Sequence, residues 1–322
     1  RTRRCIRNSR GNPGLCDLLF SLSLDNPKAC DQALGEMEAY IRSGVAPSQQ
    51  KLSDFLENLA IEHLLGLLSA PEKKLLRDSA MFIIPTPLKT LRLLADSVGA
   101  GIMAEHRLIG LGLWEVYVDI FDPKEPAAAI NALVKPVFKE PDDAEKETIA
   151  KVVVRDLFER WGGNDGRKRP YIADIELARL ALTGKDTAVA AATGEDALRG
   201  LEKNFQYREA AKLAAEMIGF LDSEGVDVPP GLLRSACERC DQIGDVENAR
   251  RFIRRSVEKF NSDSSELAER AYALGTHARM LVKDGEVEEA LKLHQEMLSV
   301  FEELGDRRSR AVTLGDLARI LV

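Results

Sequence analysis

The side chains best suited to chemistry in this 322-residue chain are five thiols, four imidazoles and a set of arginines. Cys237 and Cys240 have the Cys-x-x-Cys spacing of zinc and redox sites, but a zinc site needs a second ligand pair, and none follows at suitable spacing. Both thiols lie on one face of a helical pattern, which favours packing in a core. The histidines are scattered and form no metal-binding frame: His63, His106, His277 and His294.

Motifs for catalysis are missing from the sequence. It contains no Gly-x-Ser-x-Gly elbow for a serine nucleophile and no Gly-x-x-x-x-Gly-Lys-Ser/Thr loop for nucleotide phosphates. No hydrophobic run ends in paired acidic residues, which a nucleotide-hydrolysing core would need. We therefore expect no catalytic residue, no metal site and no enzyme activity in this chain.

Arginines gather at the beginning of the sequence, where they could touch phosphate. The same spacing fits a solvated helix, which is the preferred interpretation of these five positions: Arg1, Arg3, Arg4, Arg7 and Arg10. The net charge of −7 disfavours general nucleic-acid binding.

Composition limits the class of protein further. A chain that is 45% hydrophobic and 30% charged suits a well-folded, rather helical protein. No run approaches the roughly 18 to 20 apolar residues of a membrane span, so we expect no membrane partner. Five cysteines, an odd number, indicate a reducing compartment rather than a disulfide framework, and a cytoplasmic location is expected.

A pattern near the end of the chain marks an internal repeat. Leu274–Val282 and Leu314–Val322 share the frame Leu-Gly-x-x-Ala-Arg-x-Leu-Val at an offset of 40 residues. Ala210, Ala249 and Ala290 begin second helices 39 and 41 residues apart, as the close crossing of a helix pair requires. The pattern predicts tetratricopeptide repeats lengthened from about 34 to about 40 residues. The second copy ends the chain, so we expect a fragment of a longer array.

Repeat arrays of this kind bind partners along a concave surface. We expect four arginines of the first helices to line that surface: Arg234, Arg239, Arg279 and Arg319. Because arginine pairs well with carboxylates, such a ladder would receive an acidic peptide. The alternative, which we favour for Arg279 and Arg319, is that they form salt bridges between repeats with neighbouring glutamates.

The first part of the chain follows another pattern. Helices are predicted at 15–24, 28–43, 48–68, 71–82, 87–98 and 103–110, after an arginine-rich helical start. Residues 113–120 alternate and are rich in β-branched and aromatic side chains, which predicts a strand. Residues 129–138 would pair back on it, with Pro136 confining them to an edge. Several small helices closed by one short β-hairpin are the outline of a winged-helix domain.

The predicted fold class is therefore mainly α. A small helical domain would cover 1–68, a winged helix with one short β-hairpin 69–140, and a tetratricopeptide-like α-solenoid 141–322. The charged segment 139–143 is the predicted boundary. Helices of the solenoid are predicted at 143–161, 171–183, 186–203, 207–223, 230–243, 246–260, 264–283, 287–304 and 307–322.

Two features together resemble one family. The repeats, with segments such as Val287-Glu288-Glu289-Ala290-Leu291, look like those of bacterial signal-transduction ATPases with numerous domains, or STAND proteins. Gly11-Asn12-Pro13-Gly14-Leu15 looks like the Gly-x-Pro motif that opens the small helical domain of these ATPases, and residues 71–138 look like their winged-helix domain.

The resemblance implies positions for nucleotide contact. In the family, the proline of Gly-x-Pro touches bound adenine nucleotide, which places Gly11, Asn12 and Pro13 at the cofactor. A Met-His-Asp-like motif of the winged helix would fall at Ile130–Val134, with Asn131 where histidine is usual. Asparagine can donate a hydrogen bond but carries no positive charge. ATP or ADP is expected only in a full-length protein whose hydrolysing core precedes Arg1, and this chain has no cofactor of its own.

The resemblance also implies a function: the partner-sensing part of a signalling ATPase, with a role in antiphage defence among the family's functions. A protein or peptide on the array would release the winged helix and permit homo-oligomerisation. Two alternatives stay open. One is a stand-alone adaptor that recruits a client. The other is a winged-helix transcription regulator, against which Pro87–Leu94 carries only two positive charges and is mostly apolar.

Overall fold

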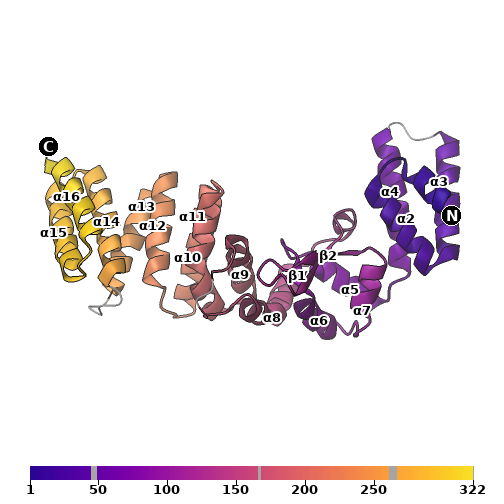
Figure 1. Ribbon diagram of the computed structural model, residues 1–322, viewed down its shortest axis with the longest axis horizontal. Coiled ribbons are helices and arrows are strands. Elements are labelled where there is room, and N and C mark those ends of the chain that lie inside the picture. The colour runs from indigo at the N-terminus through magenta and orange to yellow at the C-terminus, as the bar shows by residue number, and fades with distance from the viewer. Residues whose placement is uncertain (45–48, 166–167, 261–266, 322) are drawn as a thin grey trace. The chain divides into compact units, whose positions relative to one another are not determined.

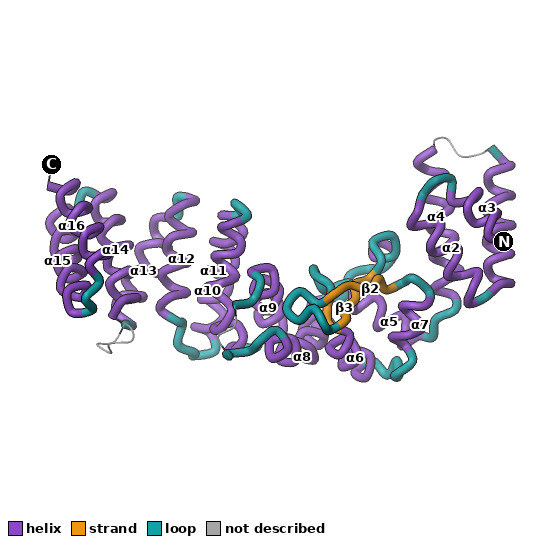
Figure 2. Tube along the Cα trace, in the orientation of Figure 1, coloured by secondary structure: helices purple, strands orange, loops and turns teal. Residues whose placement is uncertain are grey.

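The computed structural model describes residues 1–44, 49–165, 168–260 and 267–321 (Figure 1). Within these ranges the chain forms sixteen α-helices and one three-stranded sheet, which confirms the mainly α prediction (Figure 2). It divides into two compact units: unit 1 comprises 1–170 and 183–185, and unit 2 comprises 171–182 and 186–322. None of the helices described is long and apolar enough to cross a membrane.

Unit 1 begins with four helices whose starts are set by asparagine and proline. The helices are α1 (Thr2–Ser9), α2 (Pro13–Asp25), α3 (Pro27–Ser43) and α4 (Gln49–Gly66). Asn12 caps α2 through the amide of Leu15, and Asn26 caps α3 through the amide of Ala29, each at 3.0 Å. Asn26 is also the residue that ends α2, so one residue joins the two helices. Residue 48, the predicted first residue of α4, lies outside the described residues.

A second group of elements surrounds the sheet. In chain order it consists of α5 (Ala70–Ser79), β1 (Thr86–Pro87), α6 (Leu88–Ser97), α7 (Ala104–Gly110), β2 (Trp114–Val118) and β3 (Pro126–Ile130). The strands are antiparallel in the order β1-β3-β2, with Trp114 opposite Ile130 and Thr86 opposite Ala128. Ser69 and Glu72 form a reciprocal cap at the start of α5.

The predicted second strand is partly wrong. The strand is β3, which ends at Ile130, and residues 135–137 form a 3-10 helix instead. Asn131 redirects the chain there, because its side chain accepts the amide of Leu133 in a local turn. The two-residue strand β1 was not predicted, since it is too short to show alternation.

Helix α8 (Asp143–Arg160) belongs to unit 1 and packs on α6. Thr90 donates to Asp156 at 2.7 Å, and the indole of Trp161 donates to Asp119 at 2.9 Å. Unit 1 therefore continues past the predicted boundary at 139–143 to residue 170.

The remaining helices form the array. They are α9 (Tyr171–Gly184), α10 (Thr187–Lys203), α11 (Tyr207–Ser223), α12 (Pro230–Ile243), α13 (Val246–Lys259), α14 (Leu267–Asp284), α15 (Val287–Glu303) and α16 (Arg307–Leu321). The predicted helices agree with these within one residue at most ends, while residues 264–266 and 322 lie outside the described residues. The fold is a tetratricopeptide-like solenoid, as predicted.

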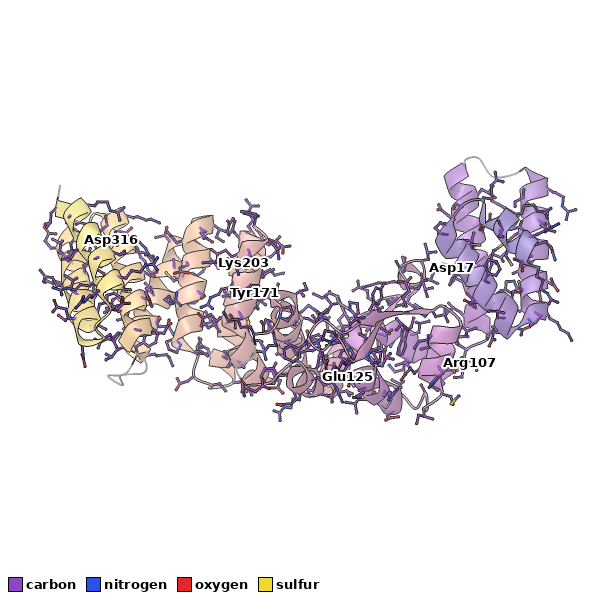
Figure 3. The ribbon with its side chains drawn as sticks, in the orientation of Figure 1. Asp17, Arg107, Glu125, Tyr171, Lys203 and Asp316 are labelled. Carbon is purple, nitrogen blue, oxygen red and sulfur yellow. The ribbon has the colours of Figure 1, made fainter. Side chains whose placement is uncertain are left out.

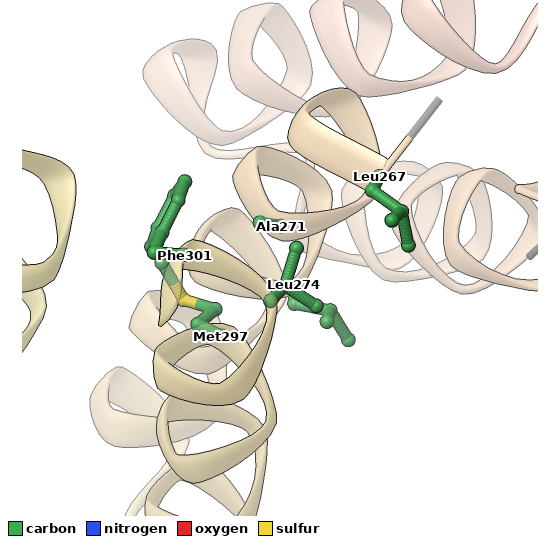
Figure 4. Close-up of a cluster of buried hydrophobic side chains, with 6 residues drawn as sticks. Leu267, Ala271, Leu274, Met297 and Phe301 are labelled. Atoms are coloured by element: carbon green, nitrogen blue, oxygen red, sulfur yellow. The ribbon is translucent and has the colours of Figure 1, made fainter. Parts of the chain in front are cut away.

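Helices of the array associate in pairs, α10 with α11, α12 with α13 and α14 with α15. The register alanines Ala210, Ala249 and Ala290 are fully buried where each second helix begins. Gly244 and Gly285 turn the chain between paired helices with φ of +83° and +81°, a region that favours glycine. Figure 4 shows the apolar cluster between α14 and α15, to which α14 contributes Leu267, Ala271 and Leu274 and α15 contributes Met297 and Phe301.

We predict that Gly200→Ala destabilises the array. A methyl group there would lie 2.7 Å from Cβ of Tyr171, and the strain is expected to cost about 1–3 kcal/mol. Tyr171 cannot easily retreat, because its Cβ is bonded directly to the backbone of α9. Its hydroxyl also accepts a hydrogen bond from Lys203 at 2.6 Å. Both residues are labelled in Figure 3.

Gly219→Ala is the matched control, since nothing lies within 4 Å of the added methyl group. This exposed position of α11 should gain about 1 kcal/mol from helix propensity. Urea unfolding followed by circular dichroism measures both changes. Equal stabilisation by both substitutions would show that the close crossing at Gly200 is not a constraint.

Candidate partner-binding groove of the helical array

The four arginines predicted to line the array have different environments. Arg234 lies between carboxylates of three helices, with Glu195 and Glu269 each at 3.3 Å and Glu238 at 3.6 Å. Its side chain is only 14% exposed. Because Glu195 belongs to α10 and Glu269 to α14, Arg234 braces the first helices of three successive repeats.

Arg239 is a second brace. It is 4% exposed and pairs with Glu202 of α10 and with Glu238, the latter at 3.0 Å. Its Nε lies buried with no hydrogen-bond partner among the described residues. A buried ion pair of this kind costs desolvation and becomes strongly destabilising when one partner is removed. Arg234 and Arg239 are therefore built into the array rather than presented to a partner.

Arg279 and Arg319 are exposed and occupy equivalent positions of the repeated frame. Arg319 pairs with Asp316 on its own helix. Arg279 donates to the hydroxyl of Thr276 at 3.0 Å and forms no ion pair within the described residues. Within the described ranges, the salt bridges between repeats that we expected at Arg279 and Arg319 are thus not found there; they occur at Arg234 and Arg239.

Two cavities meet at Arg279. The first, of about 310 Å³, lies between α10, α12 and α14 and includes Glu202, Arg239, Asp241, Thr276 and Lys283 in its lining. Its other charges are paired, because Lys283 bonds to Asp241 at 2.5 Å and Arg239 to Glu202.

The second cavity has about 510 Å³ and lies between α14, α15 and α16. Tyr272, Met297 and Phe301 supply apolar surface, and Arg279 and Arg308 stand at its polar edges. The two cavities together, joined by Arg279, are called the groove below. Sequence reasoning found Arg279 but missed the apolar cavity, because Tyr272 and Phe301 are distant in sequence and resemble ordinary core residues.

The Cys-x-x-Cys motif packs in the core, as the sequence indicated. Both thiols are buried, and the sulfur of Cys237 lies 3.3 Å from that of Met280. Burial raises the pKa of Cys237 to about 12 and that of Cys240 to about 11, so both stay protonated at neutral pH. Within the described ranges, no group of three or more His, Cys, Asp or Glu residues could hold a metal ion.

The residues expected to contact nucleotide lie in unit 1. Gly11 has a φ of +86°, and Asn12 uses both side-chain atoms internally: its oxygen caps α2 and its nitrogen donates to Glu57 at 2.6 Å. Pro13 is the first residue of α2. Asn131 is 8% exposed and donates to the carbonyl of Gly112 at 3.2 Å.

The fold brings the two predicted motifs to one place. A Cβ added at Gly14 would lie 2.8 Å from Cδ1 of Leu133, two residues after Asn131. The start of α2 therefore packs against the turn that follows β3. The asparagines are hydrogen-bonded within the chain, and contact with a nucleotide stays a prediction.

The arginine-rich start is a helix that docks on α3. Arg4 bonds to Glu38 at 2.9 Å, and Arg7 approaches the same carboxylate at 2.8 Å. A cavity of about 700 Å³ adjoins them, lined by Arg7, Asn8, Arg10, Glu38, Ile41 and Arg42. Three of these arginines stand near the C-terminal ends of α1 and α3, where the helix dipole already favours cations.

Comparison with known proteins gives one distant structural likeness. No family model matches the sequence. No curated protein matches it at a significant level. Among solved structures, the chain is similar to a Signal Transduction ATPase with Numerous Domains (STAND) protein with a tetratricopeptide repeat sensor from Pyrococcus horikoshii, at 13% sequence identity and a TM-score of 0.38. The match covers 96% of this chain but only 56% of that protein.

We predict that Glu38 contributes to the free energy of unfolding and that this contribution is lost in acid. Hydrogen bonding from Arg4 lowers the pKa of Glu38 to about 2, below the roughly 4.3 of an unfolded glutamate. The stabilising contribution of Glu38 is therefore fully present above about pH 4.3 and is lost as the pH falls toward 2. Glu38→Gln should lower the free energy of unfolding by about 1 kcal/mol at pH 7, given the partial exposure of the pair.

Urea unfolding of both proteins between pH 2 and 7 measures this contribution. The difference between wild type and Glu38→Gln should shrink as the pH falls through that window. In an Arg4→Gln background the difference should be smaller at neutral pH. A gap that is the same at every pH would contradict the pKa shift of Glu38.

Proposed function

We propose that this chain is the regulatory, partner-sensing portion of a STAND ATPase, and that its array binds a protein or peptide in the groove. The observation that carries the proposal is Arg279, an exposed cation that has no ion pair among the described residues and lies where two cavities meet. Repeat solenoids use this face for partners.

Unit 1 supports the regulatory part of the proposal. The order helix, strand, two helices, two strands in α5 to β3 is the order of a winged helix, with α8 added after it. The start of α2 packs on the turn after Asn131, so a displacement of α2 would also displace this turn. In the proposed mechanism, ATP or ADP bound by a longer protein would be held near Pro13, and this chain would not itself be an enzyme. Partner binding would favour the released, oligomerising state.

A stand-alone adaptor is the second candidate. It is favoured by the hydrogen bonds that Asn12 and Asn131 make within the chain, which leave these side chains satisfied without a ligand. DNA binding is less well supported, because the arginines of α6 and α7 are used internally. Arg92 pairs with Glu105, and Arg107 donates to the carbonyl of Leu67.

The groove can be tested with an unbiased selection. Random peptides displayed on phage would be selected on the 322-residue chain, and hydrogen exchange would be measured with an enriched peptide bound. We expect slower exchange in α12, α14 and α16. Slower exchange confined to α11 and α13, which do not line the groove, or to unit 1, would contradict partner binding in the groove.

A measurement of how fast bound ADP is released distinguishes the proposed ATPase function from the adaptor function. Pro13→Ala, in the longer protein that the proposal implies, should speed release of bound ADP severalfold, because this proline would contact the adenine. Pro27→Ala is the matched control, since Pro27 also begins a helix behind a capping asparagine. Equal release rates for wild type and Pro13→Ala would favour the adaptor.

A further inference from the structure

We propose that the groove recognises an extended peptide in which an acidic side chain pairs with Arg279 and a neighbouring aromatic side chain enters the cavity between α14, α15 and α16. This inference rests on the proposed partner-binding function and specifies the chemistry of the partner. It follows from a difference between two copies of the repeat.

The repeated frame shows why Arg279 is available. In α16 the equivalent arginine, Arg319, is neutralised by Asp316, three residues before it on the same helix. In α14 the residue three before Arg279 is Thr276, which offers a hydroxyl and no charge. The same helical geometry therefore gives an internal ion pair in one repeat, and in the other a guanidinium with no ion pair in the described part of the chain.

Arg279 retains the donors needed for a carboxylate. A guanidinium has five N–H groups in a fixed fork, and Arg279 uses one nitrogen to reach Thr276. Carboxylates accept two parallel hydrogen bonds from such a fork, which makes the pair both stronger and more selective than one with lysine. The acidic groups nearest the cavity are already engaged.

Those engaged groups are Asp306 and Asp316. Asp306 caps α16 by accepting from the amide and hydroxyl of Ser309, which helps to keep its pKa low. Asp316 is held by Arg319. Arg308, on the cavity rim, forms no salt bridge within 4 Å in the part of the chain described, so the cavity edge favours a negative ligand.

The interior of the cavity suits an aromatic side chain. Tyr272 is 45% exposed, and its ring centre lies 5.9 Å from that of buried Phe301 in a tilted arrangement. Val312, on α16, is 60% exposed. Aromatic rings favour offset and tilted contacts, so a third ring could pack on Tyr272 and exclude water.

Gly275 contributes to this apolar surface by lacking a side chain. The sulfur of Met297 lies 3.1 Å from the place a Cβ would occupy, so methionine fills the space beside the glycine. Methionine is flexible and polarisable, and it adapts to bound rings. The volume of about 510 Å³ accommodates one large side chain with its backbone.

The probe is a fluorescein-labelled peptide with blocked ends, Gly-Ser-Asp-Glu-Phe-Glu-Asp-Ser-Gly, titrated with the 322-residue chain while anisotropy is recorded. Blocking both ends removes a terminal carboxylate as a source of the charge. We expect saturable binding that weakens at least fivefold when the acidic residues become amides, and at least fivefold when Phe becomes Ser. A wild-type chain that does not bind this peptide would overturn the inference.

Two variants and one control test whether the peptide binds at Arg279. Arg279→Gln and Thr276→Asp should each weaken binding at least fivefold, the second because it supplies the internal partner that Asp316 gives Arg319. Arg208→Gln is the control, since this exposed arginine of α11 lies outside the groove and its loss changes net charge equally. An equal loss with Arg208→Gln would show general charge attraction and refute the site.

The result also separates this inference from the proposed function. If the acidic-aromatic peptide fails while selected peptides still protect α12, α14 and α16, the groove binds a partner of other chemistry. If neither binds in the groove, the proposed function fails as well. Thr276 is only 6% exposed and its hydroxyl donates to the carbonyl of Tyr272, so circular dichroism must show that Thr276→Asp keeps the fold. Arg279→Gln alters an exposed side chain and tests the site independently of that substitution.

Discussion

Small residues at the crossings of paired helices set the spacing on which the whole array depends. Ala210, Ala249 and Ala290 are fully buried at the start of successive second helices, where a larger side chain would force the pair apart. Because each pair supports the next, the separation of the first helices, and therefore the size of both cavities, follows from these crossings. Half-buried Arg234 and buried Arg239 then tie neighbouring first helices together by pairing with carboxylates.

Much of this architecture could be predicted from the sequence, because helix periodicity and capping are local properties. The array helices were placed nearly residue for residue, since Gly244 and Gly285 mark their turns and the alanines mark their register. The sheet was harder. Strand β1 has two residues, and its pairing with β3 depends on chain segments forty residues apart. The arginines were placed on the first helices, yet their roles depend on which carboxylates of neighbouring repeats reach them.

The comparison of Arg279 with Arg319 shows how a repeat acquires a distinct role. Both positions keep the same arginine, and among the differences between the two copies is the residue three places earlier, which is Thr276 in one and Asp316 in the other. An aspartate there satisfies the arginine within its own helix, whereas a threonine leaves most of its donors open to another molecule. A sequence comparison that scored only the conserved frame of the repeat would treat the two arginines as equivalent.

The junction at Asn26 has a mechanical consequence for the first helices. One residue, Asn26, both ends α2 and caps α3, so no further linker residue lies between the two helices. Inserting a single residue there would rotate α3 by about 100° around its own axis, because an α-helix turns once in about 3.6 residues. Cys30, Leu34 and Met37, all fully buried, would then swing out of the interior. This one-residue connection is therefore rigid, and a movement of α2 would move α3 with it.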